Sequence, residues 1–252
     1  MRIASLGSGS RGNATLIQHQ DTTLLVDNGF SLRQFTHRLE RLELSPEAID
    51  AVLLTHEHSD HSGGIIKLCM RYAIPLWTAV GTARAVLSSD FEYHPLVAGK
   101  SILVGSIQVM PVTVPHDANE PLQFIFSPPD NSSRLGLLTD TGHITTHIVE
   151  AFDKLDGLLL EFNYDPDMLE RGPYPEPLKQ RVGGRHGHLS NVQSMELLSR
   201  IDTSQLRHLV AAHISEKNNH PSIVTELIKQ IEDLPEPVIA GQDAGFDWID
   251  IA

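Results

Sequence analysis

The residues best suited to chemistry in this chain gather in one short segment, THEHSDHSGG at 55–64. Within six residues it offers four possible metal ligands: His56, His58, Asp60 and His61. An apolar run precedes the segment and a glycine pair ends it, so a tight turn would direct alternate side chains into one cavity. Imidazole and carboxylate groups together suit Zn²⁺, Mn²⁺ or Fe²⁺. We expect His56 and His58 to bind one ion, and Asp60 and His61 to bind another.

Three further candidate ligands follow apolar runs that are typical of buried strands. His116 comes after VTVP, Asp140 after LGLLT and His213 after LVAA. Each is a polar donor at the C-terminal end of a run that otherwise belongs to a core. Together with the histidine-rich segment, they predict a site for two divalent metal ions.

A second pair of histidines lies in GGRHGHLSN at 183–191. Because the seven ligands already serve two ions, His186 and His188 are not needed for coordination. Ser190 and Gln193 predict a capping box, and the N-terminus of a helix favours a bound phosphate. We therefore expect His188, Arg185 and Ser190 to bind substrate, with His188 holding a phosphate or protonating the leaving oxygen.

Charge and composition narrow the function classes. The net charge of −13 argues against a polyanionic partner, but residues 171–191 carry four basic side chains and one acidic side chain. Such a segment is more often a solvated surface, yet this one leads into His186 and His188. The single cysteine excludes an internal disulfide and suits a reducing compartment. We see no signal peptide or membrane span, and we expect no membrane partner and a cytoplasmic location.

The elements that would position these residues alternate between strand and helix patterns. Short apolar runs predict strands at 2–6, 14–19, 22–27, 51–54, 101–104, 107–114, 122–127, 134–140, 157–162, 207–212 and 237–240. Helical patterns lie at 32–42, 65–70, 144–151, 190–201 and 221–233, and Asp165 before Pro166 predicts another helix start. In the helix after Ser190, we expect Val192, Met195, Leu198 and Ile201 to face the core. This interleaving indicates two packed sheets with helices outside, although the pattern does not fix the topology.

The ligand series as a whole resembles the metallo-β-lactamase fold superfamily. THEHSDH, His116, Asp140 and His213 occur in that family's order, and the resemblance covers nearly the whole chain. It implies an α/β fold, the four-layer αββα metallo-β-lactamase sandwich, with two metals at one edge. By this resemblance His56, His58 and His116 hold the first metal. The second is held by Asp60, His61 and His213, and Asp140 bridges the two.

Further motifs resemble the YycJ/WalJ branch of that superfamily: SLGSGSRGNATLI, HDANEP, LTDTGH, GHLSN and HISEKNN. The branch is bacterial and is associated with DNA exonuclease activity and DNA repair. By resemblance, Asp27 supports the metal-binding segment through hydrogen bonds. Relatives that cleave phosphodiesters pair a histidine matching His188 with a glutamate, which matches Glu161 here.

The loop GSGSRGN at 7–13 does not continue into the helix that a phosphate-binding loop requires, so a plain turn is one interpretation. Similar loops in nuclease relatives lie beside the active site, and there Ser10, Arg11 or Asn13 would touch substrate. We also expect one domain over 1–252, with a short basic flap, rich in proline, at about 163–184.

The sequence thus predicts a hydrolase of phosphodiesters that uses two divalent ions, Zn or Mn with Fe as an alternative, and most plausibly acts on DNA. The resemblance implies that a hydroxide between the metals is the nucleophile. Asp60, Glu161 and His188 are the expected catalytic side chains. A thioesterase of the glyoxalase II kind, a hydrolase of small cyclic phosphodiesters and a binding module without catalysis remain alternatives.

Overall fold

The computed structural model describes residues 1–251 and contains two seven-stranded sheets. The first sheet has the order β14-β1-β2-β3-β4-β5-β6, and β3 to β6 run parallel to one another. Its strands are β1 Arg2–Gly7, β2 Ala14–His19, β3 Thr22–Val26, β4 Ala51–Leu54, β5 Leu76–Ala79, β6 His94–Leu96 and β14 Phe246–Asp250. The antiparallel pairing of β1 with β14 joins segments from opposite ends of the described chain.

The second sheet has the order β13-β12-β11-β10-β9-β8-β7. Strands β10 to β13 run parallel, so their C-terminal ends meet at one edge. The strands are β7 Ile102–Val104, β8 Ile107–Thr113, β9 Leu122–Ser127, β10 Leu135–Leu138, β11 Gly157–Glu161, β12 His208–Ala212 and β13 Val238–Ile239.

Alternation along the strands explains why the sheets stack. In β4, Leu53 packs into the core between the sheets, whereas its neighbours Val52 and Leu54 pack against helices on the outer face. In β11, Leu159 faces the other sheet while Leu158 and Leu160 face helices. A strand buried on both faces is an unbroken apolar run, which is what β4 and β11 show.

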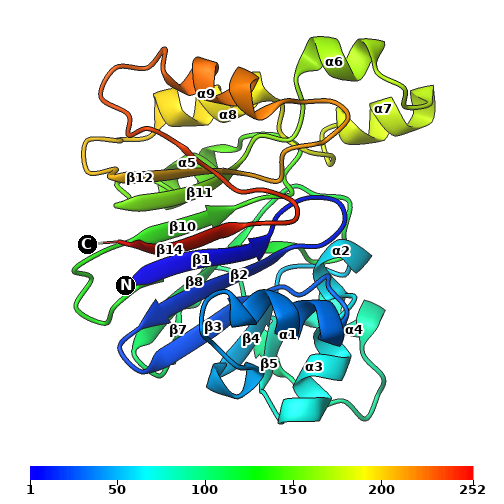
Figure 1. Cartoon of the computed structure of the whole chain (residues 1–252), viewed down its shortest axis with the longest axis vertical. Helices are drawn as coiled ribbons and strands as arrows, with labels where there is room; N and C mark the ends of the chain where they lie inside the picture. Colours follow the sequence, from blue (N-terminus) through cyan, green and yellow to red (C-terminus); the bar gives the residue numbers. More distant parts are fainter. Residues whose placement is uncertain (252) are drawn as a thin grey trace.

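Helices cover both outer faces (Figure 1). On the first sheet lie α1 Leu32–Glu40, α3 Ile65–Tyr72 and α4 Val80–Val86, and on the second lie α5 Thr146–Ala151, α8 Asn191–Arg200 and α9 Pro221–Ile228. Shorter helical segments are η1 Pro46–Ala48, α2 Ser59–Ser62, α6 Pro166–Arg171 and α7 Glu176–Val182. The layers therefore run helix, sheet, sheet, helix, and the predicted αββα sandwich is confirmed.

The predicted flap, residues 163–184, contains α6 and α7 and lies at one end of the sandwich (Figure 1). Asp165 accepts a hydrogen bond from the Met168 amide and caps α6, as its sequence predicted. Helix α7 has no buried residue, so it is held at its ends and by single side chains. Among the described residues, no helix is both long and apolar enough to cross a membrane.

Helix α8 corrects one prediction. The capping box of Ser190 and Gln193 is present, but Val192 is 63% exposed and does not face the core. The buried face instead begins with Asn191 and Ser194, whose polar groups are hydrogen-bonded, and continues into Leu197 and Leu198. Helix α9 also ends at Ile228, before the predicted residue 233. Strands β5, β6 and β14 and helix α4 were not predicted.

Candidate metal centre

The candidate site lies where strands from both sheets end. His56 follows β4, Asp140 follows β10 and His213 follows β12. Asp140 and His213 have φ values of 51° and 52°, and Asp27 after β3 has φ 60°. Left-handed backbone is unfavourable for residues other than glycine and tends to gather at functional sites. Asp27, Asp140 and His213 thus share this backbone at the ends of strands from both sheets, although it also occurs at residues outside the site.

The first group of candidate ligands is His56, His58 and His116. Nδ1 of His58 lies 3.1 Å from Nε2 of His56 and 3.2 Å from Nε2 of His116. Nδ1 of His116 donates to the Gly187 carbonyl at 2.9 Å, which turns its Nε2 toward the other two rings. Three ring nitrogens converging in this way can share one ion.

The second group is Asp60, His61 and His213, with Asp140 between the groups. Nε2 of His61 lies 3.3 Å from Oδ2 of Asp140 and 3.5 Å from Oδ2 of Asp60. Asp140 also shares a possible ligand set with His56 and His61, so its carboxylate can reach both ion positions. The seven residues expected as ligands are thus brought together at this edge, and their role as ligands stays a prediction.

Asp27 fixes the position of His61 and of the start of the histidine-rich segment through hydrogen bonds. Its carboxylate accepts hydrogen bonds from the Thr55 amide and hydroxyl, both at 2.8 Å, and from Nδ1 of His61 at 2.7 Å. Because Nδ1 of His61 donates to Asp27, Nε2 is the nitrogen directed at Asp60 and Asp140. A carboxylate behind an imidazole ligand fixes the tautomer and the ring orientation.

Two orphaned atoms show that these residues fit metal ions. Oδ2 of Asp140 and Nε2 of His213 are buried and make no hydrogen bond to the described residues. The contact between Asp140 and His61 lies within ion-pair distance but lacks hydrogen-bond geometry. Leaving buried polar atoms unpaired is costly unless something else binds them. A divalent cation between the two groups would satisfy both atoms.

The charges of the site favour the same conclusion. Burial and the neighbouring His61 lower the pKa of His56, which keeps its imidazole neutral. Burial would also lower the pKa of His213, but Asp140, Asp60 and Glu161 outweigh it and raise the pKa to about 10. Burial raises the pKa of Asp140, yet the surrounding histidines outweigh it and hold that pKa well below its usual value. The centre therefore gathers ionised carboxylates around positions where cations are needed.

Glu161 connects the metal centre to His188. Its Oε1 lies 2.8 Å from Nδ1 of His188 and 3.0 Å from Nδ1 of His213, and its Oε2 accepts from the amides of Leu189 and Thr141. Although burial raises the pKa of Glu161, the nearby His188 outweighs it and lowers the pKa, so the carboxylate is ionised and can only accept. Both rings must then donate from Nδ1. Glu161 is fully buried, does not line the cavity and contacts both histidines.

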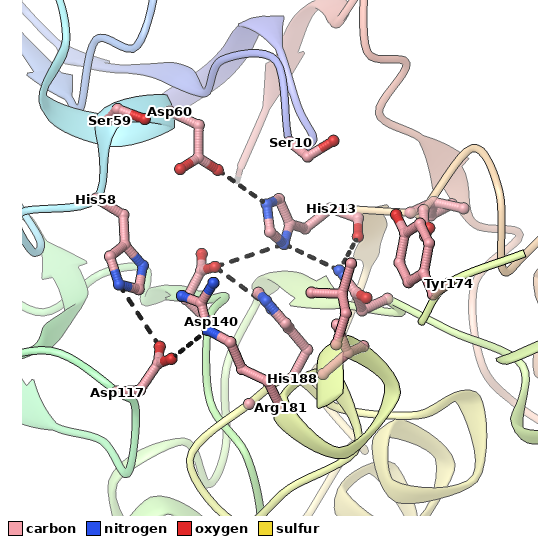
Figure 2. A pocket seen from close by; sticks show the side chains of 16 residues that line it. Ser10, His58, Ser59, Asp60, Asp117, Asp140, Tyr174, Arg181, His188 and His213 are labelled. Carbon is pink, nitrogen blue, oxygen red and sulfur yellow. Dashed lines mark hydrogen bonds and ion pairs between the residues drawn. The ribbon is translucent and has the colours of Figure 1, made fainter. Parts of the chain in front are cut away.

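A cavity of about 390 Å³ opens over the centre and exposes His58, Asp60, Asp140, His188 and His213 (Figure 2). Nε2 of His188 makes no hydrogen bond to the described residues, which leaves it available to a ligand. The polar floor and the single buried glutamate behind it resemble a hydrolytic site more than an apolar binding pocket.

The flap forms one wall of this cavity. Nε of Arg181 in α7 donates to Oδ2 of Asp117 at 2.6 Å, and Oδ1 of Asp117 lies 3.5 Å from Nε2 of His58. Asp117 thus joins the flap to the first group of ligands (Figure 2). Burial raises the pKa of Asp117, but the hydrogen bond from Arg181 outweighs it and lowers that pKa, so the pair is ionised.

The other predicted substrate-binding residues have different surroundings. Asn13 is buried, accepts from the Gly9 amide and lies 3.1 Å from Nε2 of His61, so it contacts the ligands themselves. Ser190 is buried as the cap of α8, and its hydroxyl bonds to Gln193. The Arg185 carbonyl accepts from His143, and its side chain does not line the cavity. These observations leave the three proposed contacts with substrate untested.

The loop 7–13 contributes Ser10 to the cavity. Gln242 anchors this loop, because its Oε1 accepts from the Arg11 amide at 2.8 Å and its Nε2 donates to the Gly12 carbonyl at 3.1 Å. The Arg11 side chain pairs with Glu216 and Asp243, away from the ligand groups. His186 lines a second hollow, which also includes His116 and Asp117.

Sequence analysis did not single out several residues that line the cavity, among them Asp117, Asn163 and Tyr174. Asp117 had a usable signal, since it directly follows a predicted ligand. Asn163, which donates to the His213 carbonyl at 3.0 Å, had a similar signal, since it is a polar residue just after the apolar run of β11. Tyr174 had none, because only the fold of the flap brings it to the site.

This chain is similar to known proteins in both sequence and fold. A family model described as the beta-lactamase superfamily domain matches residues 22–214. The exodeoxyribonuclease WalJ of Streptococcus pneumoniae is 34% identical over 90% of this chain and 88% of its own. The exodeoxyribonuclease YycJ of Bacillus anthracis is 29% identical over 92% of this chain and 89% of its own. Among solved structures, the metallo-beta-lactamase fold protein YhfI of Bacillus subtilis is similar, with 15% identity, a TM-score of 0.76 and 99% of each chain covered.

Proposed function

We propose that this chain, which belongs to the beta-lactamase superfamily, is a metal-dependent exodeoxyribonuclease with two divalent ions, Zn or Mn, at its centre. The observation that carries the proposal is the Glu161–His188 pair beside the ligand groups. The pair places in the cavity an imidazole that is fixed by a hydrogen bond and is not one of the seven proposed metal ligands.

The metal ions, when bound, would activate water and neutralise charge on a phosphate. His56, His58 and His116 would hold one of them, and Asp60, His61 and His213 the other, with Asp140 shared. His188 acts on the substrate. With Nδ1 fixed as a donor to Glu161, its Nε2 is directed to the cavity, where it accepts a proton or, once protonated, gives one to the leaving oxygen.

The surroundings favour a phosphodiester over a thioester. Arg181 places a guanidinium group in the cavity, and its Nη groups make no hydrogen bond to the described residues. A guanidinium matches the geometry of phosphate oxygens. A thioesterase would use the same ligands but would leave both Arg181 and the Glu161–His188 pair without a role.

The choice of DNA rests on the relatives. Two proteins that align with about nine-tenths of this chain are named exodeoxyribonucleases. We propose the same substrate and a role in DNA repair for this chain. We also propose a location in the cytoplasm, where a bacterial cell keeps its DNA.

The test is hydrolysis by protein loaded with Mn²⁺ or Zn²⁺. End-labelled DNA, end-labelled RNA, bis-p-nitrophenyl phosphate and a glutathione thioester are offered separately. We expect DNA to be shortened stepwise from one end, with release of mononucleotides. Cleavage of the thioester with all the phosphodiesters left intact would contradict the proposal.

A further inference from the structure

From the flap, and resting on the proposed function, we infer a subsite for the terminal nucleotide of the substrate, with a platform for its base formed by Tyr174, Leu178, Val182 and Ile214. All four side chains line the same cavity as His188 and Asp60. The subsite would bind a nucleoside monophosphate, which is the product that cleavage releases from the end of the DNA strand.

Helix α7 is built to present this platform. Leu178, Arg181 and Val182 stand at positions i, i+3 and i+4, so they share one face of the helix. No residue of α7 is buried, and the apolar side chains on that face line the cavity rather than the core. Tyr174 comes from the turn before α7 and joins them there (Figure 2). These side chains are half-buried, and the surface that they leave exposed faces the cavity, where an apolar part of a ligand would cover it.

The position of the phosphate identifies that partner. Arg181 stands on the same helix face as the platform, and its guanidinium is directed to the metal centre, where Asp117 holds it through Nε alone. Its Nη groups make no hydrogen bond to the described residues. A phosphate between Arg181 and His188 would therefore leave an attached base near Tyr174. Aromatic side chains bind bases by stacking on their faces, with little regard for sequence.

The size of the cavity favours one nucleotide at a chain end. About 390 Å³ is near the lower limit for small-ligand sites, roughly 300–1,000 Å³. Ile214 and Ser215 continue the wall from β12 opposite α7, so the nucleotide would lie between the flap and the second sheet. A cavity of this volume would hold a single nucleotide rather than several.

The experiment compares three probes by calorimetry on metal-loaded protein: dAMP, 2-deoxyribose 5-phosphate and inorganic phosphate. We expect dAMP to bind roughly 10- to 100-fold more tightly than the sugar phosphate, the scale of one base stacked on an aromatic ring. Tyr174→Ala should remove most of that difference, and Tyr174→Phe should retain it. Arg181→Gln should weaken all three probes alike.

The matched control is Arg171→Gln, a basic residue of the flap that does not line the cavity, and it should leave the three dissociation constants unchanged. If the protein shortens DNA but binds dAMP no more tightly than the sugar phosphate, the subsite is wrong and the proposed function stands. If DNA stays intact while dAMP keeps its advantage and loses it in Tyr174→Ala, the subsite stands and the proposed function is wrong.

Discussion

The Glu161 carboxylate contacts both His213, a proposed metal ligand, and His188, a proposed substrate-binding residue. Variants of Glu161, His188 and a metal ligand should therefore differ in their effects. Oε1 lies within hydrogen-bond distance of both His188 and His213. A change at His188 removes one of these donors and leaves the ligand groups intact. A change at Glu161 releases both rings.

We therefore expect His188→Ala to retain both metals and lose roughly 100-fold or more in phosphodiester turnover, the scale of a positioned acid or base. Glu161→Gln should lose turnover and also bind metal about 10- to 100-fold more weakly, since the partner of a ligand has been altered. Asp140→Ala, the matched comparison, should lose metal and activity together. Metal analysis after gel filtration, alongside turnover, checks all three. A missing ion in His188→Ala would make His188 a ligand instead.

Metal binding should release protons. His213 has a pKa raised to about 10, and the carboxylates of Asp140, Asp27 and Asp60 outweigh burial and raise the pKa of His61 well above its usual value. Both rings are therefore protonated in the metal-free protein at neutral pH and must lose a proton to bind through Nε2. The proton is lost more readily as pH rises toward these pKa values, so the apparent affinity for Zn²⁺ should rise from about pH 6 to about pH 8.

Calorimetric titration with Zn²⁺ in buffers of different ionisation enthalpy measures those protons directly. The observed heat should change from buffer to buffer at one pH. A heat that does not depend on the buffer would show that His61 and His213 are already neutral before the metal arrives.

At the scale of the elements, helix α8 offers a test of how it faces the core. Leu197 is fully buried whereas Val192 is 63% exposed. Leu197→Ala should lower the free energy of unfolding by about 2–5 kcal/mol, because it leaves a cavity. Val192→Ala should change it by less than about 0.5 kcal/mol. Urea unfolding of the two variants checks the position of Val192, and equal losses would mean that Val192 faces the core as Met195, Leu198 and Ile201 do.

That error has a physical reason. Asn191 and Ser194 are buried because their partners are elsewhere in the fold: Asn191 exchanges two hydrogen bonds with Asn219, and Ser194 bonds to the Glu161 carbonyl. A local apolar pattern cannot reveal such partners. The capping boxes at Ser31 and Ser190, by contrast, were predictable, because each is completed within four residues.

The same distinction separates what could be predicted of the fold and of the site. Local sequence predicts four of the strands and the polar donors that follow them, because each is an apolar run that ends in a polar residue. These strands are β4, β10, β11 and β12. Strand β14 is less evident, because FDWID is short and acidic at two of its five positions, and it pairs with β1 from far along the chain. Tyr174 likewise reaches the cavity only through the turn between α6 and α7.

For the whole molecule, the contrast between a net charge of −13 and the net positive charge of residues 171–191 predicts a strong dependence on salt. Contacts between basic side chains and DNA phosphates release counterions, whereas a small phosphodiester engages few of them. DNA hydrolysis should therefore weaken with added salt more steeply than hydrolysis of bis-p-nitrophenyl phosphate. Rates measured on both substrates from about 50 mM to about 200 mM salt check this. Equal slopes would exclude the flap as a DNA contact.

The anchoring of the 7–13 loop by Gln242 also bears on how the protein is made. Arg11 and Gln242 are 231 residues apart, and the paired strands β1 and β14 are similarly far apart in the chain. At a ribosomal rate of about 5–20 residues per second, roughly 10–50 s pass between the two ends of this contact. The histidine-rich segment therefore leaves the ribosome long before the wall that carries Ser10 is fixed. We expect a nascent chain to expose its metal-binding residues early and to gain a finished cavity only after Gln242 has emerged.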